Sequence, residues 1–129
     1  MKVHHIGYYV NSIQESVKDF EKFGWKISSP CTFDESRKIF IQFMNNSDCV
    51  IELIEPAEDC KIFPKRFKSL GSTPYHICYE CENLDEKITE LTSENFILIR
   101  EPQIAPAINN KRVAFLYAES IGQVEIIEC

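Results

Sequence analysis

The chain has 129 residues, enough for one ordinary domain and too few for two independent ones. With 44% hydrophobic and 26% charged residues it can bury a core without disulfides, and its six cysteines follow no regular spacing. The net charge of −6 disfavours nucleic acid as a partner, and no apolar run approaches the roughly 20 residues that cross a bilayer.

The first half of the chain predicts a strand, a helix and three further strands. Residues 3–10 are rich in β-branched and aromatic side chains, which is typical of a strand. Because a strand pattern begins so early, we expect no signal peptide and a cytoplasmic location. Ser12 and Glu15 form a helix-capping pair, and apolar residues at helical spacing follow until Gly24. Further strands are expected at 25–31, 37–44 and 49–55.

Residues 56–73 hold two prolines and a glycine and predict a linker with a short helical piece. The second half then repeats the first pattern. Asn83 and Glu86 open a helix that should stop at Asn95, and Gly122 is expected to turn the last hairpin. Strands are expected at 75–81, 96–100, 111–117 and 123–128. The loop 104–110 begins with apolar residues that are suited to lining or covering a cleft.

The two halves are copies of one module. A shift of 71 residues places 5–8 on 76–79, and a shift of 73 places 51–55 on 124–128. Two extra loop residues account for the change in shift. We therefore expect one domain at 1–129, made of module one at 1–55, a linker at 56–73 and module two at 74–129.

Two histidines and two glutamates occupy matched positions in these modules. His5 and His76 lie on the first strands, and Glu52 and Glu125 lie on the last strands. If the modules face each other about a pseudo-twofold axis, all four side chains can converge. Two imidazoles and two carboxylates suit one octahedral divalent cation such as Ni²⁺, Co²⁺, Mn²⁺ or Fe²⁺, and Zn²⁺ would also bind.

The ordinary alternative is that these side chains only pack or face solvent. A single histidine in a strand is usually no ligand, but Glu52 and Glu125 lie inside apolar runs, where an unpaired carboxylate is expensive to bury. Their recurrence with matched histidines favours a metal site. His4 has Tyr75 at the equivalent position and should face the other side of its strand, so we leave it out of the site. Cys78 and Cys81 are three residues apart in a strand, point to opposite faces, and are expected to be small buried side chains.

The four strands that carry these residues resemble the metal-binding strands of the vicinal oxygen chelate superfamily. The matching stretches are VHHIGYYV, CVIELIEP, YHICYECENL and RVAFLYAESIGQVEIIE. The resemblance covers nearly the whole chain. It implies an α+β fold of the glyoxalase/bleomycin-resistance type, in which two tandem βαβββ modules form a cupped mixed sheet around a metal site. The superfamily's ligands then fall on His5, Glu52, His76 and Glu125.

The resemblance also narrows the chemistry. Four protein ligands argue against an extradiol dioxygenase and against the metal-free drug-binding members. The glyoxalase I (lactoylglutathione lyase) and methylmalonyl-CoA epimerase branches remain, and both transfer a proton α to a carbonyl with a metal as Lewis acid. Metal-bound glutamates shuttle the proton in glyoxalase I, which implicates Glu125 and Glu52 as catalytic residues. The alternatives left open are a non-catalytic small-molecule binding or tailoring protein and, further away, an extradiol-type dioxygenase.

Details of the strands favour the epimerase branch. Bacterial glyoxalase I has an arginine and an asparagine where this chain has Tyr9 and Pro56, and the epimerase pattern has the proline. Some epimerases carry a third-strand glutamate that this chain lacks, and Gln42 is the polar residue of that segment.

We expect a small carbonyl substrate, either an acyl-CoA or a thiol adduct. The candidate substrate contacts are Gln42, Tyr9 and Arg112. Arg112 belongs to one of two basic clusters suited to an anionic substrate, although a solvated surface is the simpler explanation of such clusters. Dimers are common in the superfamily, which makes a homodimer an open expectation.

Overall fold

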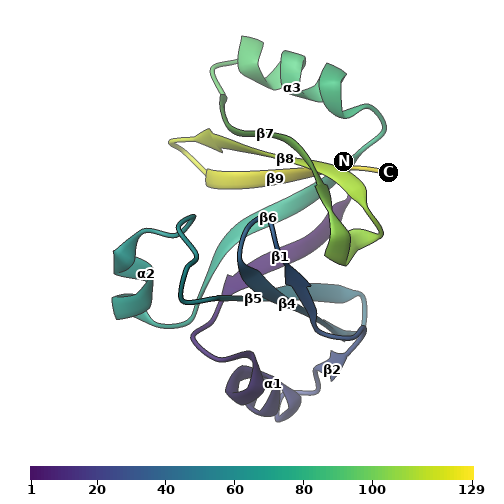
Figure 1. Ribbon diagram of the computed structural model, residues 1–129. Helices are drawn as coiled ribbons and strands as arrows, with labels where there is room; N and C mark the ends of the chain where they lie inside the picture. Colours follow the sequence, from purple (N-terminus) through teal and green to yellow (C-terminus); the bar gives the residue numbers. More distant parts are fainter. The chain divides into compact units, whose positions relative to one another are not determined.

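The computed structural model describes residues 1–129, with nine strands and three α-helices (Figure 1). In chain order they are β1 Val3–Tyr9, α1 Ile13–Glu21, β2 Lys26–Ile27, β3 Thr32–Asp34, β4 Ile39–Asn46, β5 Cys49–Pro56, α2 Lys65–Leu70, β6 Thr73–Cys81, α3 Leu84–Ser93, β7 Ile97–Ala105, β8 Lys111–Ala118 and β9 Gly122–Glu128. The chain divides into two compact units. Unit 1 comprises Met1–His5 and His76–Cys129, and unit 2 comprises Ile6–Tyr75.

The two longer helices, α1 and α3, begin at the predicted caps. The Ser12 hydroxyl accepts a hydrogen bond from the amide three residues on at 3.2 Å, and the Asn83 amide oxygen accepts the equivalent bond at 3.0 Å. Beyond the helix ends, Gly24 has a φ of +90° and Asn95 a φ of +74°, the left-handed region that glycine and asparagine tolerate best. The predicted starts and stops of both helices are confirmed.

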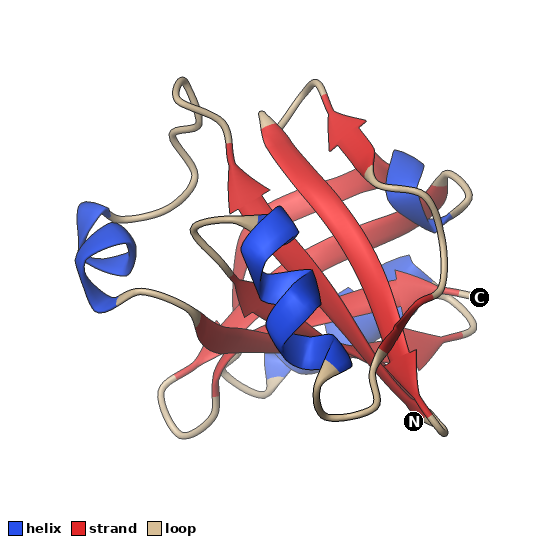
Figure 2. Ribbon diagram, turned by 90° about the horizontal axis from the view of Figure 1, so that it is seen from below, coloured by secondary structure: helices blue, strands red, loops and turns tan.

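In unit 2 the strands lie in the order β2–β4–β5–β1, and β3 also pairs with β4. β1 runs parallel to β5, and β4 runs antiparallel to it. Helix α1 covers one face of these strands (Figure 2). The buried residues of this helix-facing core are Val10, Ile13, Met44, Ile51 and Leu53.

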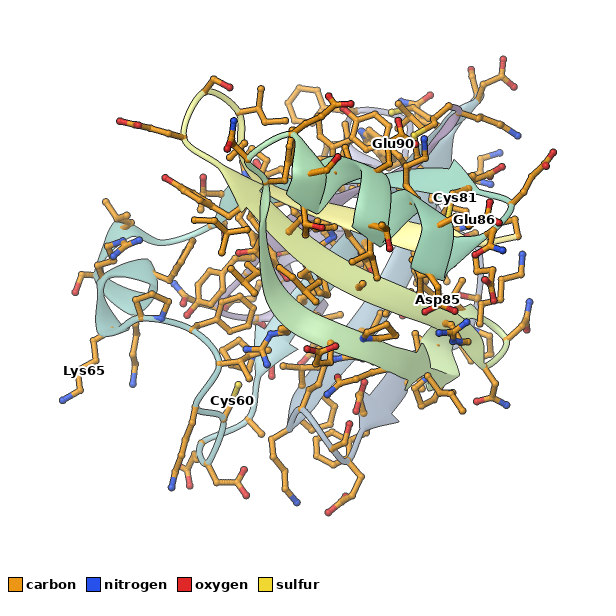
Figure 3. All side chains as sticks on the ribbon, turned by 90° about the horizontal axis from the view of Figure 1, so that it is seen from above. Cys60, Lys65, Cys81, Asp85, Glu86 and Glu90 are labelled. Atoms are coloured by element: carbon orange, nitrogen blue, oxygen red, sulfur yellow. The ribbon has the colours of Figure 1, made fainter.

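Unit 1 repeats this plan, with the strands in the order β6–β9–β8–β7. β6 is parallel to β9, and the other two pairs are antiparallel. Helix α3 lies over one face of these strands (Figures 1 and 3). The buried residues beneath it are Cys81, Leu84, Ala114, Leu116, Val124 and Ile126. Cys78 is buried beside Glu125 in the β6–β9 register, away from Cys81, and all six cysteines are free thiols.

Two segments differ from the sequence prediction. The strand expected at 25–31 is reduced to Lys26–Ile27, because Pro30 lacks an N–H for a ladder, and a short strand follows at Thr32–Asp34. In the second half, β7 continues to Ala105 instead of ending near residue 100. β7 lies at the edge of unit 1, and two register shifts along it accommodate Pro102. The loop expected at 104–110 is therefore partly strand and partly a 3₁₀ turn, Pro106–Ile108.

Candidate metal centre

Three of the four predicted ligands lie together inside unit 1. His5 comes from β1, His76 from β6 and Glu125 from β9, and their exposed fractions are 1%, 3% and 3%. Strand geometry explains their meeting. Glu125 is the register partner of Cys78, and His76 lies two residues before Cys78, so the two side chains point to the same face of the sheet.

The three ligand atoms form a nearly equilateral triangle. Glu125 Oε2 lies 2.9 Å from His76 Nε2 and 3.2 Å from His5 Nε2, and the two Nε2 atoms are 3.3 Å apart. Adjacent corners of an octahedron with metal–ligand bonds of about 2.1 Å lie roughly 3.0 Å apart. The three groups are therefore spaced to hold three neighbouring positions around one cation.

The electrostatics of Glu125 suit the same role. Burial alone would raise its pKa, but the imidazoles of His5 and His76 beside it hold the pKa well below the ordinary glutamate value. The carboxylate is thus anionic at neutral pH in a site closed to water. Its Oε2 atom is fully buried and makes no well-aligned hydrogen bond. A buried anionic oxygen between two imidazole nitrogens is a donor set that borderline divalent cations prefer.

Glu52 occupies the matching position in unit 2. It lies on β5, is 5% exposed, and is the register partner of Gly7 on β1 and of Phe43 on β4. Its neighbours Ile51 and Leu53 face α1, so Glu52 points to the opposite face of the sheet. A carboxylate buried on the face opposite α1 is what the repeat predicts.

Gln42 lies on the face of its strand opposite Glu52. It pairs with Leu53 across β4 and β5, which places it on the α1 side, opposite Glu52. Its amide Nε2 donates to the Ser29 carbonyl at 2.6 Å and to the Phe43 carbonyl at 3.0 Å. Both donors of this amide serve the backbone, and a contact between Gln42 and a substrate stays a prediction.

Arg112 forms ion pairs with two carboxylates of unit 1. Its guanidinium binds Asp85 on α3, with a shortest distance of 3.0 Å, and approaches Glu128 on β9 at 3.4 Å. Asp85 is labelled in Figure 3 on helix α3. The side chain therefore ties α3 to its sheet, on the face opposite Glu125, and a substrate contact by Arg112 stays a prediction.

Tyr9 is almost fully buried in an aromatic cluster of unit 2. Its ring lies 5.1 Å from that of Phe63 and 5.3 Å from that of Phe67, and Phe63 also contacts Tyr75. Burial raises the pKa of the Tyr9 phenol above its usual value, so it stays neutral. It shares the strand face of Gly7, on which Glu52 also lies, and a substrate contact there stays a prediction.

Sequence reasoning missed a second pair of glutamates. Glu55 accepts a hydrogen bond from the amide of Ile13 at 2.7 Å, and Glu128 accepts the equivalent bond from Leu84 at 2.9 Å. Each carboxylate caps the first turn of the helix that packs on its own sheet. The signal was present in the repeat, since Glu55 and Glu128 match at the same shift as the two predicted ligands.

Solved structures with the same fold were found across nearly the whole chain. Hypothetical protein BH1468 from Bacillus halodurans C-125 has a TM-score of 0.84 at 26% identity, with 99% of this chain and 94% of that chain covered. Methylmalonyl-CoA epimerase from Mycobacterium tuberculosis has a TM-score of 0.82 at 17% identity, with coverages of 98% and 86%. A variant of the Streptomyces coelicolor methylmalonyl-CoA epimerase in complex with 2-nitronate-propionyl-CoA has a TM-score of 0.82 at 16% identity, with coverages of 99% and 96%. At these identities the two epimerases establish the fold only.

No curated protein matches the chain. None of its helices is long and apolar enough to cross a bilayer. The glyoxalase-type α+β fold predicted from the sequence is confirmed by the structure and its neighbours. The family model of the glyoxalase/bleomycin resistance protein/dioxygenase superfamily matches residues 4–115. This span includes most of both modules, and the chain accordingly belongs to that superfamily.

Proposed function

We propose that the protein is a divalent-metal-dependent isomerase or lyase that transfers a proton at the carbon α to a carbonyl, in the manner of methylmalonyl-CoA epimerase or glyoxalase I. The observation that carries this proposal is the buried triangle of His5, His76 and Glu125, with ligand atoms 2.9 to 3.3 Å apart. The anionic state of Glu125 supplies the charge that a divalent cation requires.

Glu52 is proposed as the fourth ligand on the basis of register. In unit 1, Glu125 is the register partner of Cys78, and His76 lies two residues before Cys78 in the same strand. The same relation holds in the other copy, because His5 lies two residues before Gly7, the partner of Glu52. Equal register in a parallel strand pair gives equal side-chain direction. We therefore propose that Glu52 points to the same face of its strand pair as Glu125 does of its own.

The chemistry then divides between the cation and the two carboxylates. A bound divalent cation would act as a Lewis acid and stabilise negative charge that develops on the substrate's carbonyl oxygen. Glu52 and Glu125 are proposed to take the proton from the α-carbon and return it. Their burial supports this role, because a carboxylate that has lost its hydration shell is a stronger base than one in water.

The side chains of β4 that share a sheet face with Glu52 support a role of the proposed ligand glutamates as the catalytic base. It presents Ile39, Ile41 and Phe43, all apolar. This strand offers no additional carboxylate there to act as a separate base. We therefore assign the proton shuttle to Glu52 and Glu125, as in the glyoxalase I arrangement, whereas the proline that ends β5 is shared with the epimerase pattern.

The proposal is tested by metal content followed by exchange of the substrate's α-proton. Protein purified without added metal would be analysed by mass spectrometry for bound ions, then stripped and reloaded with Ni²⁺, Co²⁺, Mn²⁺ or Zn²⁺. Methylmalonyl-CoA and the hemithioacetal of methylglyoxal and glutathione would be incubated with it in deuterium oxide. About one ion per chain and metal-dependent deuterium incorporation into one substrate are expected. Failure to bind any of these ions would refute the proposal.

A non-catalytic binding protein is the second candidate. It is favoured by one finding, that the polar groups of Gln42 and Arg112 bind other groups of the protein itself. Such a protein would bind metal and an acyl-CoA or thiol adduct in calorimetry, yet would leave the α-proton of the bound molecule unexchanged in deuterium oxide. Incorporation of deuterium above the uncatalysed rate would eliminate it.

A further inference from the structure

His4, which the repeat excludes from the site, contacts one of the site's ligands. Its Nδ1 atom lies 2.8 Å from His5 Nδ1, and the two rings are nearly perpendicular, with an interplanar angle of 79°. His5 thus uses both ring nitrogens. Nε2 lies at the triangle with His76 and Glu125, while Nδ1 is held by its chain neighbour.

The two nitrogens of a neutral imidazole have opposite roles. One carries a proton and donates, and the other carries the lone pair that accepts a hydrogen bond or binds a metal. For His5 Nε2 to act as a ligand, its Nδ1 must keep the proton and donate it. His4 Nδ1 is at normal N–H···N hydrogen-bond distance to accept that proton.

We infer that His4 is a positioning residue, which accepts the Nδ1–H of His5 and so keeps the His5 Nε2 lone pair directed at Glu125 and His76. The inference rests on the proposed function, in which His5 binds a divalent cation. Metal-binding histidines commonly have their second nitrogen held by a carboxylate, a carbonyl or a water. Here a second imidazole takes that place, and in the other copy of the module the equivalent residue is Tyr75.

A competing arrangement would make His4 a metal ligand in its own right. Donor atoms of His4, His5 and Cys78 lie within 4.8 Å of one another, which is a spacing open to an ion. If that ion were bound through Nδ1 while Nε2 held the ion of the triangle, His5 would have to lose its second proton and bridge two cations through one ring. A direct N–H···N contact of 2.8 Å needs no such deprotonation, so the geometry favours the positioning role.

Three variants separate these readings. His4→Phe keeps a ring but removes the acceptor. His4→Asn places an amide oxygen where Nδ1 stands, which makes it the conservative rescue. Val3→Thr, on the same strand and half exposed, is the matched control. The first readout is the tautomer of His5 in the metal-free protein, from ¹⁵N–¹H NMR of the ring nitrogens. The second is the affinity and stoichiometry of Co²⁺ binding by absorption titration, with the melting temperature as a measure of folding.

The expected result is a His5 that is protonated on Nδ1 in the wild type and in His4→Asn, and that shifts toward the Nε2–H form in His4→Phe. Co²⁺ binding by His4→Phe should weaken by about 10- to 100-fold, while Val3→Thr and His4→Asn stay close to the wild type. An Nε2-protonated His5 in the wild type, or an unchanged tautomer in His4→Phe, would overturn the inference. Binding of two Co²⁺ ions with one lost in His4→Phe would overturn it as well, because His4 would then be a ligand. Absence of any Co²⁺ binding by the wild type would count against the proposed function, and the metal-free NMR would still decide the role of His4.

Discussion

Glu125 and Glu128 are three residues apart on one strand and therefore point to opposite faces of the sheet. Glu125 lies in the candidate metal centre with two imidazoles, and Glu128 holds the first turn of α3. Two carboxylates of the same strand thus lie in the candidate metal centre on one face and at the start of a helix on the other, so a variant of either is a matched control for a variant of the other.

Replacement of Glu125 by glutamine should affect the metal centre first. The substitution keeps the shape of the side chain but removes the anionic oxygen that lies 2.9 Å from His76. We expect Co²⁺ or Ni²⁺ affinity to fall at least 100-fold, roughly 3 kcal/mol, as for the loss of a charged partner in a buried site. Isothermal titration calorimetry would measure it. Glu128→Gln should bind the ion as the wild type does, and equal losses in the two variants would contradict the assignment.

The burial of Glu52 and Glu125 could be predicted from sequence because both carboxylates lie inside apolar runs and recur at matched positions of the repeat. Gln42 and Arg112 could not be placed in this way. Every neighbour of Gln42 in β4 is apolar, so alternation along the strand does not show which face it occupies. The face on which Gln42 lies follows from the pairing of Phe43 with Glu52. This pairing could not be predicted, because strand register depends on contacts between residues that are distant in sequence.

At the scale of elements, each helix is fixed to its sheet by a carboxylate from the last strand of its module. Glu55 accepts the Ile13 amide at the start of α1. Replacement of Glu55 by alanine should lower the free energy of unfolding by about 1–2 kcal/mol, because the first turn of α1 loses an acceptor and a favourable charge. Urea denaturation would measure the change. Glu21→Ala, at the exposed end of the same helix, should stay within about 0.5 kcal/mol of the wild type.

The turn between β3 and β4 should make stability depend on pH. Burial alone would raise the pKa of Asp34, but hydrogen bonds from the Arg37 amide and the Ser36 hydroxyl, together with the Arg37 charge, lower it below the usual value. A carboxylate with a depressed pKa in the folded state stabilises the protein above its unfolded pKa and loses that contribution as the pH falls through the folded pKa.

Asp34→Asn should therefore destabilise the protein by about 3 kcal/mol at pH 7, since it leaves the buried Arg37 guanidinium without its charged partner at 2.6 Å. The difference between wild type and variant should shrink as the pH falls below about 4, where the aspartate of the unfolded chain begins to bind its proton while the folded carboxylate, with its lower pKa, is still ionised. Urea unfolding at a series of pH values tests this. A difference that is the same at pH 7 and at pH 3 would show that the ion pair is not its source.

The order of elements could be predicted from sequence where capping residues and periodicity act locally, as at Ser12 and Asn83. The prediction failed where tertiary pairing decides. β7 carries charges and Pro102, which predict a loop, yet β8 provides it with a ladder over most of its length. An edge strand tolerates such residues because one side of its backbone needs no partner.

For the molecule as a whole, a bound cation should be visible as stability. An ion present at about 100 times its dissociation constant adds about 2.7 kcal/mol to the folded state. For a chain of 129 residues this corresponds to a rise in melting temperature of roughly 10 °C. Calorimetry with and without a chelator would detect it. The rise should be absent in Glu125→Gln, and a chelator effect of the same size in that variant would mean that the ion binds elsewhere.

Because Glu125 and Glu128 point to opposite faces of the sheet, they also limit the insertions and deletions that the hairpin of β8 and β9 can tolerate. One residue inserted into the turn before Gly122 would shift β9 by one position and turn each of its side chains to the other face. Glu125 would then enter the apolar core under α3, while the helix would lose its carboxylate cap. Insertions and deletions in this hairpin should therefore be absent or come in pairs of residues, even though its turn lies at the surface, where length changes are usually tolerated.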